Sequence, residues 1–158
     1  MTTSKDMIII GGVVKTLCEH NSWSSETHVQ KTLYIAKHVR NVPLTAEFLL
    51  YKHGPYSFEL NKSISHMLAR NILRSTQNAG FGPSLDLNRP MWEALDSAAG
   101  GYFAQHRDKI EFVCQYLANR NVSELERIST AIFVDINFPQ LNSNSKVRKL
   151  TELKPHIS

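Results

Sequence analysis

The seven histidines of this 158-residue sequence are its best candidates for binding a metal ion or transferring a proton. They are His20, His28, His38, His53, His66, His106 and His156. A helical zinc site needs two histidines at four-residue spacing with an acid between them, and other zinc sites use closely spaced cysteine pairs. The histidines have neither that spacing nor a cysteine pair nearby. The sequence therefore predicts no metal site.

Ser57 has the setting that comes nearest to that of a catalytic nucleophile, because it follows a turn after an apolar run. The nucleophile elbow of serine hydrolases has the form Gly-x-Ser-x-Gly, whereas the residues around Ser57 are PYSFE. The glycine pair Gly11 and Gly12 is not followed by the Gly-Lys-Ser/Thr of a phosphate-binding loop. We therefore predict neither a catalytic residue nor a bound cofactor, and we expect the protein not to be an enzyme.

The two cysteines, Cys18 and Cys114, are far apart in the sequence and have no paired spacing. Each falls at an apolar position of a helical pattern, where burial disfavours the reactive thiolate. We expect both to be buried free thiols of a protein in a reducing compartment.

The densest group of polar and aromatic side chains is the YKHGPYS segment, residues 51–57. Gly54 and Pro55 predict a sharp turn, and Ser57 is placed to cap the helix that follows. Three polar-tipped side chains are left without such a structural role: Lys52, His53 and Tyr56. Exposed turn residues most often only connect elements, and the alternative is that these three side chains converge on one binding patch.

The composition is that of an ordinary globular protein, with 42% hydrophobic and 20% charged residues. We expect a single domain, residues 1–158, with a core that needs no disulfide or metal. The net charge of +4 permits contact with nucleic acid without requiring it. The apolar run at residues 7–10 is far shorter than the roughly 20 residues of a membrane span. We expect no membrane partner, no signal peptide and a cytoplasmic location.

Apolar residues at helical spacing predict two N-terminal helices. The first covers residues 7–21, and the glycine pair inside it means that either the helix packs closely there or it starts later. The second starts at a capping pattern, WSSE at residues 23–26, and runs to about Arg40. An apolar run rich in aromatic residues then predicts a strand at residues 47–52.

A third helix is predicted from Ser57 to about Arg70. Two extended pieces, residues 72–76 and 84–88, predict a β-hairpin around the glycine-rich tip GFGP at residues 80–83. The order helix, helix, strand, helix, hairpin is close to that of a winged helix, with the hairpin as the wing.

The rest of the chain predicts further helices. A glycine pair at residues 100 and 101 and a turn at residues 119–121 separate them, and Ser123 with Glu126 has the pattern of a capping box. A last short helix ends at residues 154 and 155. We therefore predict a mostly α fold of the α+β class, a helical domain with a small winged-helix-like β element.

Three segments resemble the YwgA-like family: VQKTLYIA at residues 29–36, FLLYK at 48–52 and HGPYS at 53–57. The YwgA-like family and its relatives carry a helix with glutamine, lysine, apolar residues and tyrosine, and then a strand that ends in a Gly-Pro-Tyr-Ser turn. The tail LTELKPH at residues 150–156 is similar to the Leu-Lys-Pro ending of YwgA-like chains. More distantly, the sequence resembles the Panacea domains, which include SocA-type antitoxins.

The resemblance implies a compact helical domain with a small β element that works by protein contact, without enzymatic activity. Panacea domains neutralise diverse toxins, and a YwgA-like domain forms the toxin-binding part of the DarG antitoxin, which restrains a DNA ADP-ribosyltransferase. The net charge here is +4, whereas a domain that imitates nucleic acid is expected to be acidic.

The leading hypothesis is therefore a non-enzymatic, protein-binding regulatory module that neutralises a toxin or effector, as in bacterial defence. The alternative is a winged-helix DNA-binding regulator, whose third helix would enter the major groove. The residues that we expect at the partner-binding surface are Lys52, His53, Tyr56, Asn61, Lys62, His66 and Arg70, with Gly54, Pro55 and Ser57 as structural turn residues.

Overall fold

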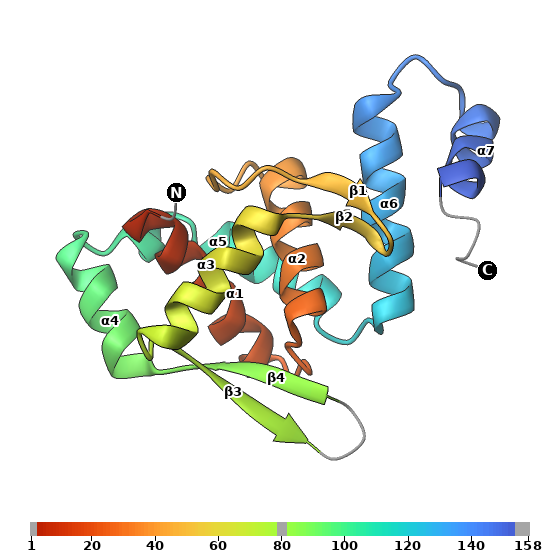
Figure 1. The fold of residues 1–158 in the computed structure, drawn as a ribbon. Coiled ribbons are helices and arrows are strands. Elements are labelled where there is room, and N and C mark those ends of the chain that lie inside the picture. The colour runs from red at the N-terminus through yellow and green to blue at the C-terminus, as the bar shows by residue number, and fades with distance from the viewer. Residues whose placement is uncertain (1–2, 79–81, 154–158) are drawn as a thin grey trace.

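The computed structural model describes residues 3–78 and 82–153, and it has a mostly helical α+β fold, as predicted (Figure 1). The helices are α1 (Ser4–Glu19), α2 (Glu26–Val39), α3 (Phe58–Ala69), α4 (Arg89–Ala98), α5 (Arg107–Leu117), α6 (Val122–Asn137) and α7 (Ser143–Leu153). The strands are β1 (Leu49–Tyr51), β2 (Gly54–Tyr56), β3 (Leu73–Asn78) and β4 (Gly82–Leu87), and a 3-10 helix covers Tyr102–Gln105.

The central helix is α1, which contacts α2, α3, α4 and α5. It begins three residues before the predicted start, because the Thr3 hydroxyl accepts a hydrogen bond from the Asp6 N–H at 3.0 Å and so caps the helix. The middle of α1 is buried on all sides, with Ile8, Ile9 and Ile10 fully covered. A helix that is apolar all round in this way belongs in the core.

The glycine pair lies inside α1 and permits close packing. A Cβ atom on Gly11 would lie 2.3 Å from the Trp92 ring, and one on Gly12 would lie 2.3 Å from the Phe103 ring. The two rings meet edge to face at 5.2 Å, and the Trp92 Nε1–H donates to the Ile8 carbonyl at 3.1 Å. The glycines therefore let α4 and the 3-10 helix approach the α1 backbone.

The predicted start of α2 is confirmed. The Ser25 hydroxyl accepts a hydrogen bond from the His28 N–H at 3.3 Å, and Glu26 supplies the acid of the first turn. The buried face of α2 includes Val29, Leu33 and Ala36, and it packs against α1, α5 and α6.

The first hairpin differs from the prediction. We predicted one strand at residues 47–52 and a turn at Gly54 and Pro55, whereas β1 pairs antiparallel with β2, and Tyr51 lies opposite Gly54. The turn is thus at Lys52 and His53, and Gly54, Pro55 and Tyr56 form a strand. The physical reason is the backbone of Gly54, whose φ of +98° is open to glycine and lets the chain reverse two residues earlier.

Ser57 caps α3 as predicted, since its hydroxyl accepts a hydrogen bond from the Leu60 N–H at 3.0 Å. The hairpin of β3 and β4 is also confirmed, with Leu73 opposite Leu87 and Ser75 opposite Leu85. Gly82 and Pro83, predicted in its tip, belong to β4, and residues 79–81 lie outside the described part of the chain.

The two hairpins form separate two-stranded sheets within the described residues. The predicted order of helix, helix, strand, helix and hairpin is found with one additional strand, β2, which pairs with β1 and leaves the β3–β4 hairpin without a third strand. In Figure 1 the two hairpins lie on opposite sides of α3. The predicted wing-like hairpin is therefore present as a separate two-stranded sheet.

The start of α6 carries a capping box two residues before the predicted one. The Asn121 side chain accepts a hydrogen bond from the Glu124 N–H at 2.8 Å, and the Glu124 carboxylate accepts one from the Asn121 N–H at 3.1 Å. The predicted pair, Ser123 and Glu126, already lies inside the helix, because the chain enters the helical conformation at Val122.

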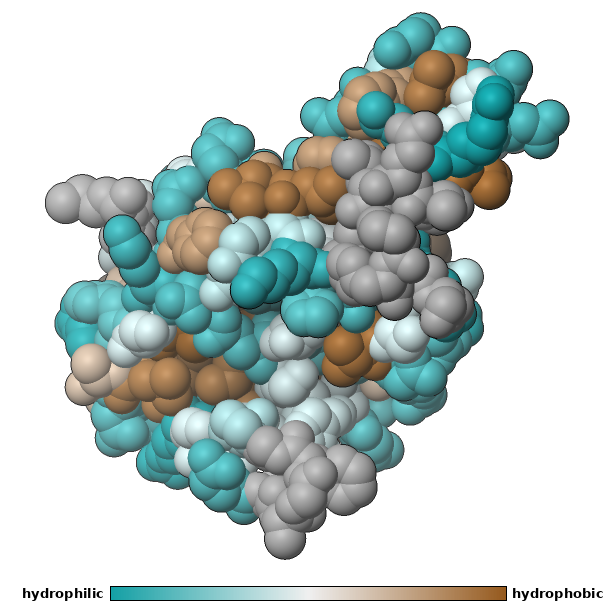
Figure 2. Space-filling model, turned by 45° about the vertical axis from the view of Figure 1, so that its right-hand side comes forward, coloured by the Kyte–Doolittle hydropathy of each residue, from teal (hydrophilic) through white to brown (hydrophobic). Residues whose placement is uncertain are grey.

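The C-terminal helix α7 packs on α6, and in Figures 1 and 2 it projects from the rest of the molecule. Within the described residues, no helix is both long enough and apolar enough to cross a membrane.

Candidate functional site

The β1–β2 hairpin contains the predicted patch, and a buried glutamine fixes its position. The Gln30 side chain donates to the Ser57 carbonyl at 2.9 Å and accepts from the Ser57 N–H at 3.0 Å. Both residues are completely buried. A side-chain amide that pairs with both backbone groups of one residue acts as a strand partner does, so Gln30 continues the pairing beyond β2.

A buried lysine holds the preceding residue. Lys31 is only 2% exposed, and its Nζ donates to the Pro55 carbonyl at 2.8 Å. Lysine is rarely buried to this extent, because the charged ammonium loses its hydration unless polar groups of the protein replace it. The adjacent residues Gln30 and Lys31 therefore fix the end of the hairpin to α2.

Gly54 lies in close contact with α6. A Cβ atom on Gly54 would lie 2.8 Å from the Thr130 hydroxyl oxygen and 3.5 Å from that of Ser129. Only glycine fits this backbone conformation at this distance from α6. The hairpin is thus seated between α2 and α6.

Three aromatic side chains of the hairpin and its exit form what we call the aromatic face: Tyr51, Tyr56 and Phe58. The ring centroids lie 5.8 Å apart for Tyr51 and Tyr56, 5.2 Å for Tyr51 and Phe58, and 5.0 Å for Tyr56 and Phe58. Tyr51 and Phe58 are each 46% exposed. Such mutual packing orders the rings while leaving much of their area open to solvent.

Glu26 fixes the polar end of the aromatic face. Its carboxylate accepts hydrogen bonds from the Tyr56 hydroxyl at 3.4 Å and from the Asn61 amide at 2.9 Å. Burial, and then the nearby Glu26 carboxylate, raise the pKa of the Tyr56 phenol above its usual value. Tyr56 therefore presents a neutral phenol at neutral pH.

The other predicted residues of the turn lie at its exposed end. Lys52 is exposed, and the His53 side chain is 68% exposed, with its Nδ1 3.5 Å from a carboxylate oxygen of Glu126 on α6. The structure therefore brings Lys52, His53 and Tyr56 onto one hairpin, and it brings Asn61 to the same edge through Glu26.

Two further predicted residues, Lys62 and His66, line a separate groove of about 490 Å³ beside α3. Its other walls are α1 and residues 44–46, and the Asp6 carboxylate there accepts a hydrogen bond from the Thr45 N–H at 3.1 Å. Arg70 is exposed at the C-terminal end of α3. The predicted set is thus divided between the hairpin and the outer side of α3.

The sequence analysis did not identify the residues that hold the hairpin in place, nor did it assign to the site the exposed rings of Tyr51 and Phe58. Gln30 and Lys31 lie on a helix whose residues 28–36 are all buried, so helical periodicity gave them no distinct position. Phe58 and Tyr51 are apolar enough to be expected in a core. Two indications pointed to Gln30 and Lys31: they are long polar residues within the apolar pattern of a helix, and they belong to a segment that resembles the YwgA-like family.

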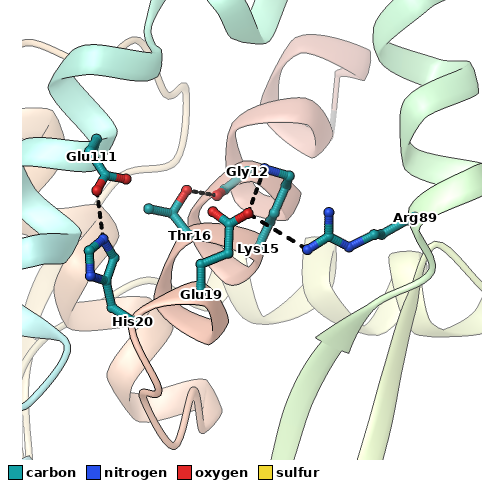
Figure 3. A network of polar contacts seen from close by, with 7 residues as sticks. All are labelled: Gly12, Lys15, Thr16, Glu19, His20, Arg89 and Glu111. Atoms are coloured by element: carbon teal, nitrogen blue, oxygen red, sulfur yellow. Dashed lines mark hydrogen bonds and ion pairs between the residues drawn. The ribbon is translucent and has the colours of Figure 1, made fainter.

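A second polar cluster joins α1 to its neighbours and has a structural role (Figure 3). Lys15 and Arg89 both point to the Glu19 carboxylate, with nitrogen–oxygen distances of 3.1 and 3.7 Å. His20 meets Glu111 of α5 at 2.6 Å. Half-exposed ion pairs of this kind contribute little individually, and here they connect the end of α1 to α4 and α5.

The thiols and the histidines form no metal-binding cluster in the part of the chain that the structure describes. Cys114 is a buried free thiol as predicted, whereas Cys18 is a free thiol that is only partly buried, because it lies at the end of α1. Burial raises the pKa of both thiols, which keeps them protonated at neutral pH. Among these residues, no group of three or more histidine, cysteine, aspartate or glutamate side chains is placed to hold a metal ion.

Comparison of the sequence with protein-family models gives no match, and comparison with curated proteins gives none either. The geometry of the aromatic face is therefore the basis on which a function can be assigned.

Proposed function

We propose that the chain is a protein-binding regulatory module that docks on its partner through the aromatic face. The observation that supports this proposal is the combination of exposed rings with a rigid, buried support. Tyr51 and Phe58 are half exposed, whereas the residues beneath them, Gln30, Lys31 and Ser57, are almost completely buried.

Tyrosine and phenylalanine are enriched where proteins meet, because they bury a large area and lose few rotamers on binding. Rings that are already ordered before binding lose even less conformational entropy. Lys52 and Asn61 lie at the rim of the same surface, where polar groups give orientation and specificity. These properties favour docking on a protein over catalysis.

We further propose that the partner is a toxin or other effector protein, which the chain neutralises by contact. The resemblance to YwgA-like and Panacea domains supports this partner class, because the residues that carry it are those that build the site. The Gly-Pro-Tyr-Ser segment is β2 with Ser57, and the glutamine and lysine of its helix are Gln30 and Lys31.

Co-expression with the product of each neighbouring gene tests this proposal. We expect one neighbour to be toxic alone, to be rescued by this chain, and to co-purify with it. The double variant Tyr51→Ala, Phe58→Ala is expected to lose rescue, and the control Met91→Ala, a similarly exposed residue on α4, is expected to retain it. Absence of any toxic or bound neighbour, or full rescue by the double variant, would contradict the proposal.

Nucleic-acid binding is the second candidate, and one observation favours it. Lys62 and His66 on α3 and Arg70 at its C-terminal cap are exposed at four-residue spacing, so they lie along one side of the helix. A titration of a DNA duplex tests it, since phosphate contacts weaken steeply as salt increases. Binding that is absent at low salt, or that persists in Lys62→Glu and Arg70→Glu, would remove this candidate.

A further inference from the structure

A second exposed surface lies between α2, α5 and α6, and we call it the apolar groove. Its volume is about 260 Å³. Side chains from all three helices line it, including Ile35 and Val39 of α2, Phe112 and Tyr116 of α5, and Ile128 and Ile132 of α6. None of these residues belongs to the aromatic face, so the apolar groove is a separate feature.

The rim of the apolar groove exposes more apolar side chain than the aromatic face does. Val39 is 50% exposed, Phe112 55% and Tyr116 62%. Exposed apolar residues that are contiguous, rather than scattered, mark surfaces that another molecule covers.

Two arginines lie on the aromatic rim of this groove. The Arg40 guanidinium lies 4.4 Å from the Phe112 ring centroid, and that of Arg120 lies 4.8 Å from the Tyr116 centroid. Because Phe112 and Tyr116 are four residues apart on α5, they are separated by about 6 Å along the helix axis. Arg120 also meets Glu124 at 3.4 Å. Arg40 is therefore the principal cation of the rim, and Arg120 carries a partly compensated charge.

The lining of the groove decides which backbone it can accept. Apart from the Tyr116 hydroxyl, the side chains that line it have no polar atoms. An extended peptide would leave backbone N–H and C=O groups without partners there, at a cost for each of them. A helix satisfies its own backbone groups and offers apolar side chains every three or four residues.

We propose that the apolar groove docks an amphipathic helix of a partner protein, with its apolar stripe in the groove and acidic residues along the edges facing Arg40 and Arg120. The inference rests on the proposed function, in that the chain works by protein contact. It adds a second contact and the chemistry of the segment that fills it. The complementary charge of the arginine rim selects an acidic helix over a basic one.

Three fluorescent helical peptides with one apolar stripe and with glutamate, lysine or glutamine edges test the inference by anisotropy on the full chain. We expect the glutamate-edged peptide to bind at least about tenfold more tightly than the lysine-edged one. Tyr116→Glu should weaken it by at least about tenfold, because it places a charge in the groove. Arg40→Glu should abolish the preference for glutamate edges. The control Met91→Glu on α4 should change neither.

Two results would overturn the inference: no binding of the glutamate-edged peptide up to about 1 mM, or equal binding of all three peptides. A dimer of this chain that dissociates in Tyr116→Glu would show that a second copy fills the groove instead. The variants change exposed residues, and circular dichroism verifies their folding. The two tests can also give different results. If rescue from the toxic neighbour requires Tyr51 and Phe58 but no helical peptide binds, this inference is overturned and the proposed function stands.

Discussion

The two hairpins of this molecule are stabilised in different ways. The β1–β2 hairpin has three-residue strands, and buried polar side chains of α2 hold it in place through Gln30 and Lys31. The β3–β4 hairpin has six-residue strands, and buried leucines attach it to the core. A two-stranded hairpin is marginal by itself, so each needs its anchors.

The two kinds of anchor differ in how precisely they fix the backbone of the hairpin. Two side chains of one helix, Gln30 and Lys31, fix the end of the first hairpin by hydrogen bonds. The second hairpin has hydrogen bonds to Ser24 at Leu85, and its buried leucines add contacts that are less directional. A surface that must present ordered rings benefits from the first kind of anchor. The aromatic face thus lies on the hairpin that α2 holds through two polar side chains.

The largest effect is expected from removing the lysine anchor. Lys31→Met keeps most of the buried volume but leaves the Pro55 carbonyl without its donor, which should lower the free energy of unfolding by about 2–4 kcal/mol. The matched change at the second hairpin is Ser24→Ala, which removes the hydroxyl that donates to the Leu85 carbonyl at 2.7 Å. There we expect a loss of about 1 kcal/mol. Urea denaturation measures both, and equal losses would contradict the difference between the hairpins.

The next largest effect is expected at Gly54. Gly54→Ala combines a φ of +98° with a Cβ only 2.8 Å from the Thr130 oxygen, so it should lower the free energy of unfolding by roughly 2–3 kcal/mol. Gly100→Ala is the control, because Gly100 has a φ of +74° and nothing within 4 Å of the added atom. It should cost about 1 kcal/mol. Thermal unfolding of the two variants separates the steric contact from the backbone conformation, and equal costs would show that α6 does not hold the hairpin closely.

A smaller, pH-dependent effect is expected from α2, which carries both anchors. His28 is buried, and burial lowers its pKa, while its Nε2–H donates to the Leu117 carbonyl at 3.1 Å. The unfolded chain therefore takes up a proton as the pH falls through about 6.5, where the folded chain does not. Stability should be complete above this pH and decrease below it, by at most about 1.4 kcal/mol per pH unit for one proton.

His28→Gln keeps a donor for the Leu117 carbonyl and removes the titration. Urea denaturation at pH 7.5 and 5.5 should show a smaller acid-dependent loss in His28→Gln than in the wild type. Burial lowers the pKa of His38 and His106 as well, so part of the loss should remain. An identical pH dependence in the two proteins would show that His28 does not couple protonation to folding.

The features that could be predicted from the sequence depend on neighbouring residues. Ser25 and Ser57 cap their helices as predicted, and β3 and β4 pair as the predicted hairpin, because capping and hairpin preferences act within a few residues. The strand of residues 54–56 was missed, because local preferences favour a turn at Gly54 and Pro55.

The features that could not be predicted depend on contacts between distant residues. Gln30 and Lys31 act on residues 27 and 24 positions further along the chain. Phe58 was missed as part of the site for a similar reason: its exposure follows from where the hairpin is seated. Of the predicted contact residues, Lys52, His53 and Tyr56 lie on one hairpin, while Lys62 and His66 line a different groove.

Hydrogen exchange of the backbone, compared between the free chain and its complex with the co-purified partner, shows whether the aromatic face is the docking surface. We expect slower exchange in the complex over residues 49–58, with little change over the β3–β4 hairpin. Slower exchange confined to the β3–β4 hairpin and α4, with residues 49–58 unchanged, would contradict it.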